Sequence, residues 1–347
     1  MKIDFTAHIY ELKNWTPRKK DELLPFADKF FRQPINSSTR TCILGELNGV
    51  TGSIFEFFQT DASAKRVMVV ISRHSADPLS EPDARGVLGQ FVGSTQKEAV
   101  SRVLWARGNL HDGRANASKF LRESDSLTAS DFATHGRLQV VADAKGVAVI
   151  DESDNSYPPE KRAERLAVLT ALCFAYQSVL DAAIDLLADA GRQSAARSET
   201  QLREWSRYMS SFYFHEPIKL ATIELARFYG CIRDRHTISG LAHEVTEQLK
   251  LLADLVRLDR SEAQTIREKS IQFRVGIAGV ALALIGATLT FAQVTPKVIA
   301  DSISQWSECG KRSGIPSCIA GHYVENEKSS SQGQIARQVG AKKISKN

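Results

Sequence analysis

Two histidines, His236 and His243, lie seven residues apart in a segment with helical periodicity. Seven residues make about two helical turns, so both side chains would lie on one face. Imidazole nitrogens are common zinc ligands, but a zinc site needs three or four protein ligands, and no carboxylate pair stands at ligand spacing around both histidines. We therefore interpret them as surface or core histidines and predict no metal site here.

Two groups containing carboxylates are further candidates for chemistry. His111-Asp112 is a pair typical of metal-dependent phosphohydrolases, but the other histidines and aspartates of such a site are not evident. Asp151, Glu152 and Asp154 follow a predicted strand and could hold a cation weakly, although a solvated turn is the simpler interpretation. No Ser-His-Asp signature, CxxC pair or dinucleotide fingerprint occurs. The sequence therefore predicts no catalytic residue, no metal and no cofactor.

Three glycines, Gly45, Gly49 and Gly52, lie between two apolar runs. Their spacing loosely resembles a phosphate-binding loop, but no Lys-Ser/Thr pair follows Gly52, as such a loop requires. A turn-rich connection between two strands explains them better. We predict a β-hairpin.

The five cysteines fall into two groups. Cys42, Cys173 and Cys231 are scattered, whereas Cys309 and Cys318 bracket a short segment with two glycines and a proline. That segment could close as a disulfide if it faces an oxidising compartment, and two free thiols are the alternative.

Residues 275–294 are twenty consecutive residues without a charge, VGIAGVALALIGATLTFAQV. Twenty residues of helix rise about 30 Å, the thickness of the hydrocarbon core of a bilayer. A helix of a soluble core seldom needs apolar residues on every face over that length. We predict one transmembrane helix near the C-terminus. The alternative is a buried helix of a soluble protein.

Small and polar residues within this helix indicate two further roles. Small side chains let helix backbones approach closely in lipid, so we expect a ridge of them to support self-association into a homo-oligomer. The ridge consists of Gly276, Gly279, Ala283, Gly286 and Ala287. Three polar residues in the second half could line a narrow pore or lie near the lipid headgroups. They are Thr288, Thr290 and Gln293.

The charge distribution predicts an orientation in the membrane. The twenty residues before residue 275 contain five Lys or Arg residues, and the twenty after residue 294 contain three. The positive-inside rule then places the N-terminal part in the cytoplasm, and no secretory signal is visible at Met1. We expect a single-pass protein of a bacterial inner membrane. The formal net charge of +5 is modest and fits lipid headgroups better than nucleic acid.

The fold class expected from the pattern is an α+β cytoplasmic domain followed by a helical bundle with a long stalk helix and the transmembrane helix. Residues 1–74 contain several strands, residues 75–90 form a loop, residues 91–133 are helical, and RLQVVADAKGVAVIDES (137–153) forms a hairpin. The predicted boundaries give domains at 1–156, 157–274 and 275–294, an extracytoplasmic segment at 295–325 and a disordered tail at 326–347.

The second half of the chain has helical periodicity. Helices are expected at 162–191, at 201–214 and through the segment IKLATIELARFYGCIRDR. A fourth begins near Thr237, and no Pro or Gly interrupts it between Leu241 and Arg274, so we expect it to continue into the membrane segment as a helix of more than fifty residues. A helix this long needs partners along its length.

This order of parts resembles the CorA-like divalent-cation channels. The resemblance covers residues 137–294 and depends on the hairpin at 137–153, the following helices, and the stretch LLADLVRLDRSEAQTIREKSIQFR that leads into the membrane segment. It implies a homo-oligomeric stalk with a cytoplasmic sensory domain. The Gly-Met-Asn signature and the second membrane helix of that family are missing, so the resemblance transfers neither its ion selectivity nor its binding residues.

Three functional hypotheses follow. The first is a cytoplasmic domain that senses an unknown ligand or protein and is coupled through the stalk to a bundle of membrane helices, which could conduct ions. The second is a membrane anchor or scaffold that presents a cytoplasmic binding domain without a channel. The third is an enzyme with its site within residues 75–150, the least regular region.

Overall fold

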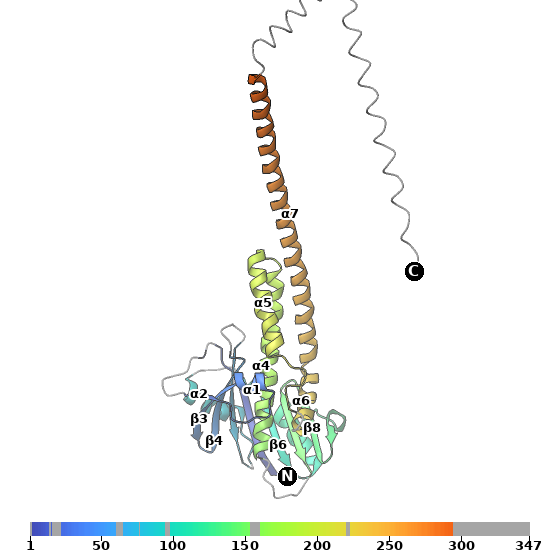
Figure 1. Ribbon diagram of the computed structural model, residues 1–347. Coiled ribbons are helices and arrows are strands. Elements are labelled where there is room, and N and C mark those ends of the chain that lie inside the picture. Colours follow the sequence, from blue (N-terminus) through green and yellow to red (C-terminus); the bar gives the residue numbers. More distant parts are fainter. Residues whose placement is uncertain are drawn as a thin grey trace, which may run out of the picture. The chain divides into compact units, whose positions relative to one another are not determined.

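The computed structural model has two compact units, Met1–Glu262 and Ala263–Asn347. Side chains are described as far as residue 287, and the backbone is described for residues 2–13, 15, 22–59, 65–75, 77–93, 98–152, 160–219 and 223–293. The first unit contains a mixed sheet and the helices packed on it (Figure 1).

The sheet has nine strands in the order β2-β3-β4-β5-β1-β6-β9-β8-β7. All neighbours are antiparallel except β6 and β9, which run parallel. The strands are β1 (Lys2–Glu11), β2 (Leu24–Pro25), β3 (Arg40–Leu47), β4 (Val50–Phe57), β5 (Arg66–Arg73), β6 (Ser101–Arg107), β7 (Ala133–His135), β8 (Leu138–Asp143) and β9 (Gly146–Asp151). Since β1 pairs with both β5 and β6, the N-terminal strand lies at the centre of the sheet.

Both predicted hairpins are present. Strands β3 and β4 meet at Asn48-Gly49, where both residues have positive φ, as a two-residue hairpin turn requires. Gly45 and Gly52 lie within the strands and pair with each other, so the three glycines form a hairpin and no phosphate loop. Strands β8 and β9 form the second hairpin.

One face of the sheet carries α2 (Glu81–Val92) and α3 (Leu110–Arg122). Helix α2 packs on β4 and β5, and α3 packs on β6 and β9. The prediction of a loop over residues 75–90 was wrong from Glu81 onward. Pro82 stands in the first helical turn, where its missing N–H removes no hydrogen bond, and the Ser80 side chain accepts a hydrogen bond from the Asp83 N–H as the N-cap.

Strand β6 corrects a second prediction, that of helix over residues 91–133. The segment SRVLWAR is a central strand, and Trp105 and Leu104 in it are fully buried. Two Arg residues and the polar sequence around the strand hid its alternating pattern. The predicted helical content is found in α3 and in a short 3-10 helix at Ala129–Asp131.

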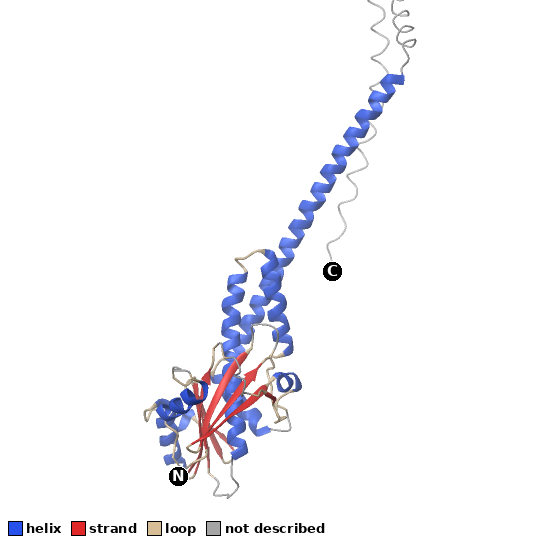
Figure 2. Cartoon of the chain, turned by 90° about the vertical axis from the view of Figure 1, so that its left-hand side faces the viewer, coloured by secondary structure: helices blue, strands red, loops and turns tan. Residues whose placement is uncertain are grey.

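The other face of the sheet carries the helices that follow residue 160. Helix α4 (Glu160–Ala190) packs on β5, β6 and β1 and contacts α5 (Ala195–Ser211) and α6 (Ile223–Arg235), as the blue helices beside the red sheet in Figure 2 illustrate. A short helix, α1 (Gln33–Ser38), precedes β3. One continuous core joins sheet residues such as Trp105 to helix residues such as Leu172. The division predicted at residue 156 therefore does not separate two cores.

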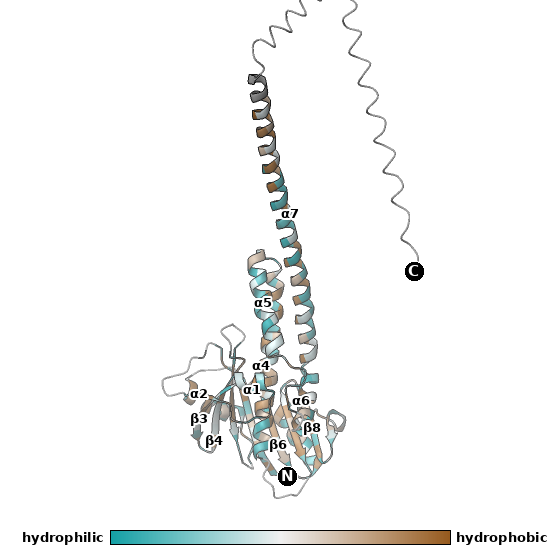
Figure 3. Cartoon of the chain, in the orientation of Figure 1, coloured by the Kyte–Doolittle hydropathy of each residue, from teal (hydrophilic) through white to brown (hydrophobic). Residues whose placement is uncertain are grey.

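Helix α7 (Ile238–Gln293) is 56 residues long, which agrees with the unbroken helix expected from the sequence. In the first unit, α7 contributes Val245 and Leu252 to the core. In the second unit, its described side chains are exposed, and the hydrophobic ones are concentrated toward its C-terminal part, coloured brown in Figure 3. The sheet domain followed by long helices confirms the coarse fold prediction.

Candidate functional site

A cleft of about 1120 Å³ lies between α2 and α3 in the first unit. Because α2 packs on β4 and β5 while α3 packs on β6 and β9, the central strand β1 lies between the two helices on this face. The floor of the cleft includes Ile3 and His8 of β1 and Leu104 of β6. The volume is at the upper end of the range typical of small-molecule sites.

The side chains of β1 alternate between two environments. Phe5, Ala7 and Ile9 belong to the core beneath α4, whereas Thr6 and His8 alternate with them and point to the α2–α3 face. Both polar side chains are almost completely buried. The Thr6 hydroxyl accepts a hydrogen bond of 3.1 Å from the N–H of Leu79, which fixes the segment leading into α2.

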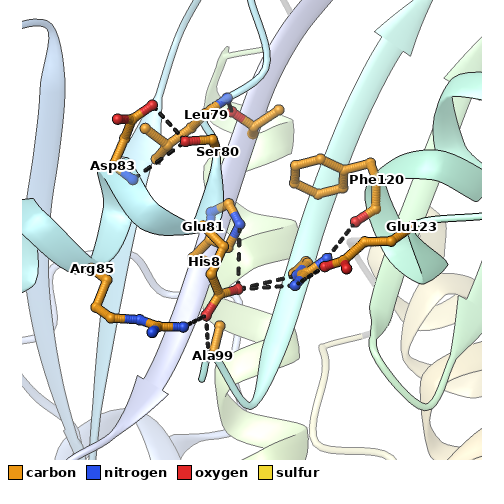
Figure 4. A network of polar contacts seen from close by, with 11 residues as sticks. His8, Leu79, Ser80, Glu81, Asp83, Arg85, Ala99, Phe120 and Glu123 are labelled. Carbon is orange, nitrogen blue, oxygen red and sulfur yellow. Dashed lines mark hydrogen bonds and ion pairs between the residues drawn. The ribbon is translucent and has the colours of Figure 1, made fainter. Parts of the chain in front are cut away.

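Glu81, the first residue of α2, brings together three elements at this cleft (Figure 4). One carboxylate oxygen accepts hydrogen bonds from the Ala99 N–H at 2.7 Å and from Arg85 at 3.3 Å. The other accepts a hydrogen bond from Arg102 Nε at 3.2 Å and lies 3.9 Å from His8 Nε2. The carboxylate therefore connects α2 to strands β1 and β6.

Arg102 is held in place by the sheet and by α3. It is the register partner of His8 across β1 and β6, so their side chains leave the same face of the sheet. Its guanidinium also donates to the Phe120 carbonyl oxygen at 3.0 Å and to Glu123 at 2.8 Å. Gly146, its parallel partner in β9, has a φ of 151°, and a Cβ there would collide with the Arg102 carbonyl oxygen. Glycine therefore allows β9 to approach β6 at this point.

The surroundings set the protonation states of this cluster. Burial, which outweighs the attraction of the nearby Glu81 carboxylate, lowers the pKa of His8 to about 4, so the imidazole is neutral at pH 7. Burial alone would raise the pKa of Glu81. The Ala99 N–H and the charges of Arg85 and Arg102 oppose that effect and hold this pKa below its ordinary value. A neutral imidazole thus faces an ionised carboxylate.

The remaining charges at the cleft lie on α3 and on the β8–β9 turn. Asp143 forms ion pairs with Arg122 and, at 3.4 Å, with Arg235. Lys119 and Lys145 also line the cleft. Among the residues that the structure describes, no ion-pair partner is found for either ammonium group.

The histidines considered in the sequence do not form a site. His236 precedes the first residue of α7 and packs edge-on against the Phe174 ring at 4.7 Å, so it does not share a helix face with His243. Burial lowers the pKa of His236. His111 and Asp112 are largely exposed at the start of α3. Within the described ranges, no group of three or more metal-ligating side chains is found.

The carboxylates after the second hairpin are only partly described. Asp151 is buried at the end of β9, where its carbonyl oxygen accepts a hydrogen bond from the Gly108 N–H. Asp154 lies outside the described residues.

The small residues of the predicted membrane segment lie in the second unit. Gly276, Gly279, Ala283, Gly286 and Ala287 are all exposed on α7. For Thr288, Thr290 and Gln293 the helical backbone is described but the side chains are not, and Cys309 and Cys318 lie outside the described residues.

Two helices in the described part of the chain are long and apolar enough to cross a membrane, α4 and α7. By this criterion both have an eighteen-residue window with a mean hydropathy of 1.6. The window in α4 is 67% buried within the protein, and the window in α7 is 0% buried. Membrane association is thus compatible with the composition of both helices, but only α7 presents its apolar window to the surroundings.

Sequence reasoning missed the cleft residues. His8, Glu81 and Arg102 are far apart in the chain and meet only through the register of β1 with β6 and the docking of α2. One signal was present: the segment DFTAHIY places polar residues at alternate positions of an otherwise apolar strand. A strand with polar residues on one face and apolar residues on the other need not be at a sheet edge, because its polar face can line a site.

Comparisons of this chain with family models, with curated proteins and with solved structures return no match.

Proposed function

We propose that this protein is a single-pass membrane protein in which a cytoplasmic ligand-binding domain is coupled through α7 to self-associating membrane helices. In this proposal residues 275–294 cross a bacterial inner membrane once, with the N-terminus in the cytoplasm. The α2–α3 cleft is the ligand-binding part, and α7 transmits its state.

The observation that carries this proposal is the contrast within α7. The helix begins among core residues such as Val245 and ends in an apolar stretch whose described side chains are all exposed. Exposing Val280, Leu284 and Ile285 to water is unfavourable, at about 1.5–3 kcal/mol for each large side chain relative to burial. A bilayer would cover these side chains and leave every backbone hydrogen bond within the helix.

The first experiment is membrane fractionation of the expressed full chain with a carbonate wash. We expect retention in the pellet. The substitutions Leu282→Arg and Ile285→Arg together should shift protein to the soluble fraction, because each Arg near the centre of a span costs about 3 kcal/mol of insertion. The matched control is Leu282→Ile with Ile285→Leu. Release of the unmodified protein by carbonate would refute the membrane span.

Self-association is supported by the small residues of α7. Size analysis in detergent should give a discrete species larger than the 38.3 kDa chain, and Gly279→Leu with Ala283→Leu should reduce its size. An unchanged size would remove these residues from the interface. A monomer in the membrane fraction would favour the alternative, an anchor that only holds the binding domain at the bilayer.

Ion conduction is the most specific form of the proposal, and it depends on the CorA-like order of parts. Flux through vesicles that contain the purified protein is the direct test, with a variant in which an unrelated apolar helix replaces residues 275–294 as control. Equal flux through both proteins would exclude a channel formed by this segment. Retained biological function in the swapped variant would favour the anchor.

The orientation is tested at the other end of the helix. An alkaline phosphatase fused after residue 347 should be active, because the positive-inside bias places residues 295–347 outside the cytoplasm. Mass spectrometry without reduction should then find a Cys309–Cys318 bridge. An inactive fusion would reverse the orientation.

A further inference from the structure

We propose that the α2–α3 cleft binds a small organic anion, such as a phosphate or carboxylate compound, that also carries a hydrogen-bond donor. Lys119 and Lys145 contact the anionic group, and the imidazole of His8 accepts the hydrogen bond. This inference rests on the ligand-binding role given to the cleft above and names the chemistry of its ligand.

The first argument concerns charge. The lining contains five Lys or Arg residues and four carboxylates. Three of those carboxylates are held by arginine: Glu81 by Arg85 and Arg102, Glu123 by Arg102, and Asp143 by Arg122. The fourth, Glu98, is exposed.

Carboxylates already bound by arginine are poor ligands for an added cation. The two lysines lack ion-pair partners among the described residues and remain able to bind an anion. An ammonium group provides three donors and is a common partner of phosphate and carboxylate groups. The charge left at the cleft therefore favours an anion.

The second argument comes from His8. Its side chain is 1% exposed and lines the cleft, yet its Nδ1 has no hydrogen-bond partner within the described part of the protein. An unsatisfied buried polar group costs about 1–3 kcal/mol, so a ligand that supplies a partner recovers that energy on binding.

The tautomer of His8 determines which kind of partner is missing. The Glu81 carboxylate lies 3.9 Å from Nε2 and is ionised, so the tautomer with hydrogen on Nε2 is favoured electrostatically. Nδ1 then carries a lone pair and can only accept. The ligand must therefore present a hydroxyl or amino group to Nδ1 in addition to its anionic group.

Apolar residues of the cleft fit the body of such a molecule. Phe120 packs edge-on against the His8 ring at 5.5 Å, and Leu79 and Leu104 contribute to the same wall. Small-molecule sites commonly combine an apolar lining with a few oriented polar groups. The cleft thus has a place for an anion, a hydrogen-bond acceptor and an apolar surface.

Lysine labelling of the full-length protein in detergent tests the anion. Inorganic phosphate is the first probe, chloride at equal ionic strength is the control salt, and the exposed Lys161 of α4 is the internal reference. At a concentration ten times the dissociation constant, about nine-tenths of the sites are filled, so acylation of Lys119 and Lys145 should slow about tenfold relative to Lys161. Equal labelling rates in phosphate and chloride across the titration would overturn the proposal.

A second probe tests the donor. Ribose 5-phosphate, which adds hydroxyl groups, should protect the two lysines at lower concentrations than inorganic phosphate. His8→Phe should abolish this difference while phosphate protection persists, and His8→Gln, whose side-chain oxygen accepts a hydrogen bond, should retain part of it. Circular dichroism identifies variants that fail to fold. If folded His8→Phe protein keeps the full difference, His8 is not the acceptor.

The labelling result is independent of the membrane test. It requires only the folded first unit, whether the chain is recovered in the pellet or in the soluble fraction. Protection of the lysines in a soluble protein would retain the ligand site and refute the membrane coupling. A pellet protein without protection would do the reverse.

Discussion

Helix α4 and the C-terminal part of α7 have the same mean hydropathy, 1.6 over eighteen residues, and opposite surroundings. The window of α4 lies within the core between the sheet and the other helices, while that of α7 is fully exposed. Hydropathy measures only the tendency of a segment to leave water. What satisfies that tendency, a sheet or a bilayer, depends on the partners that the rest of the chain supplies.

Charged residues separate the two helices within their sequences. Helix α4 carries Arg165, which pairs with Asp28 at 2.6 Å, and Asp181, which lines a second cleft. Burial and the neighbouring Asp185 raise the pKa of Asp181. Residues 275–294 contain no charged side chain. A helix that is buried in protein can place charges at its edges, whereas a helix in hydrocarbon has few such positions.

The same charged substitution should act differently in the two helices, and this is the largest expected effect. Leu172→Arg in α4 buries an unpaired charge and should cost at least about 4 kcal/mol, enough to unfold much of the first unit. Leu282→Arg should leave the thermal unfolding of that unit unchanged and should weaken membrane retention only. Circular dichroism melts and fractionation read out the two effects.

Volume-conserving controls belong to this pair of variants. Leu172→Met and Leu282→Met should both behave like the unmodified protein to within about 1.5 kcal/mol. If Leu282→Arg lowered the melting temperature as much as Leu172→Arg, the C-terminal part of α7 would be a core element, and the contrast with α4 would disappear.

Truncation to alanine sharpens the comparison at a smaller scale. Leu172→Ala removes buried methyl groups and should destabilise the first unit by about 2–5 kcal/mol. Leu282→Ala changes an exposed side chain and should alter the same unfolding transition by less than about 0.5 kcal/mol. Urea titrations of the detergent-solubilised chain give both values. Similar losses for the two variants would contradict the exposed position of Leu282.

The two helices also show what the sequence was sufficient to predict. The length of α7 followed from an apolar stripe without Pro or Gly, and the β8–β9 hairpin followed from two β-branched runs around a turn. These features depend on residues that are close together in the chain. Strand β6 was missed because its burial comes from β1 and β9, which lie far from it in the sequence.

The cleft was missed for a related reason. Thr6 and His8 gave the local pattern of a strand, but nothing near them in the sequence indicated that Glu81 and Arg102 would join them. The N-terminus of α2 was mistaken for a loop because proline is also common in loops. Long-range register therefore determined the site, and short-range patterns determined the elements that carry it.

A third, polar kind of burial extends the comparison to pH. The pKa of His8 is lowered from 6.5 to about 4, so in this range the unfolded chain binds a proton that the folded chain does not. Stability from this group is fully present above pH 6.5 and is lost as the pH falls toward 4, by roughly 3 kcal/mol in total. The apolar contacts of α4 have no such dependence.

The variant His8→Gln isolates this contribution, because it keeps a polar group and removes the titration. The difference in unfolding free energy between pH 7 and pH 4.5 should be smaller in the variant than in the unmodified protein. Urea titrations at both pH values measure it. An identical pH dependence in the two proteins would mean that His8 titrates normally in the folded state.

The smallest effect is expected where α7 is last held by the first unit. Arg260 of α7 contacts Glu199 of α5 at 2.6 Å, and both side chains are partly or largely exposed. Exposed ion pairs contribute little and are screened by salt, so Arg260→Gln should leave the melting temperature almost unchanged. It should, however, speed amide hydrogen exchange in α7 around residue 260 at low ionic strength and not in about 1 M salt.

Arg257→Gln is the matched control, because Arg257 is exposed on the same helix and has no ion pair among the described residues. Faster exchange in Arg260→Gln alone would show that the pair with α5 restrains α7 just before the segment whose side chains are fully exposed. Equal exchange in the two variants would place the end of the restrained part of α7 earlier, at core residues such as Val256. The apolar contacts of α7, rather than its charges, would then mark the point at which the helix leaves the support of the protein.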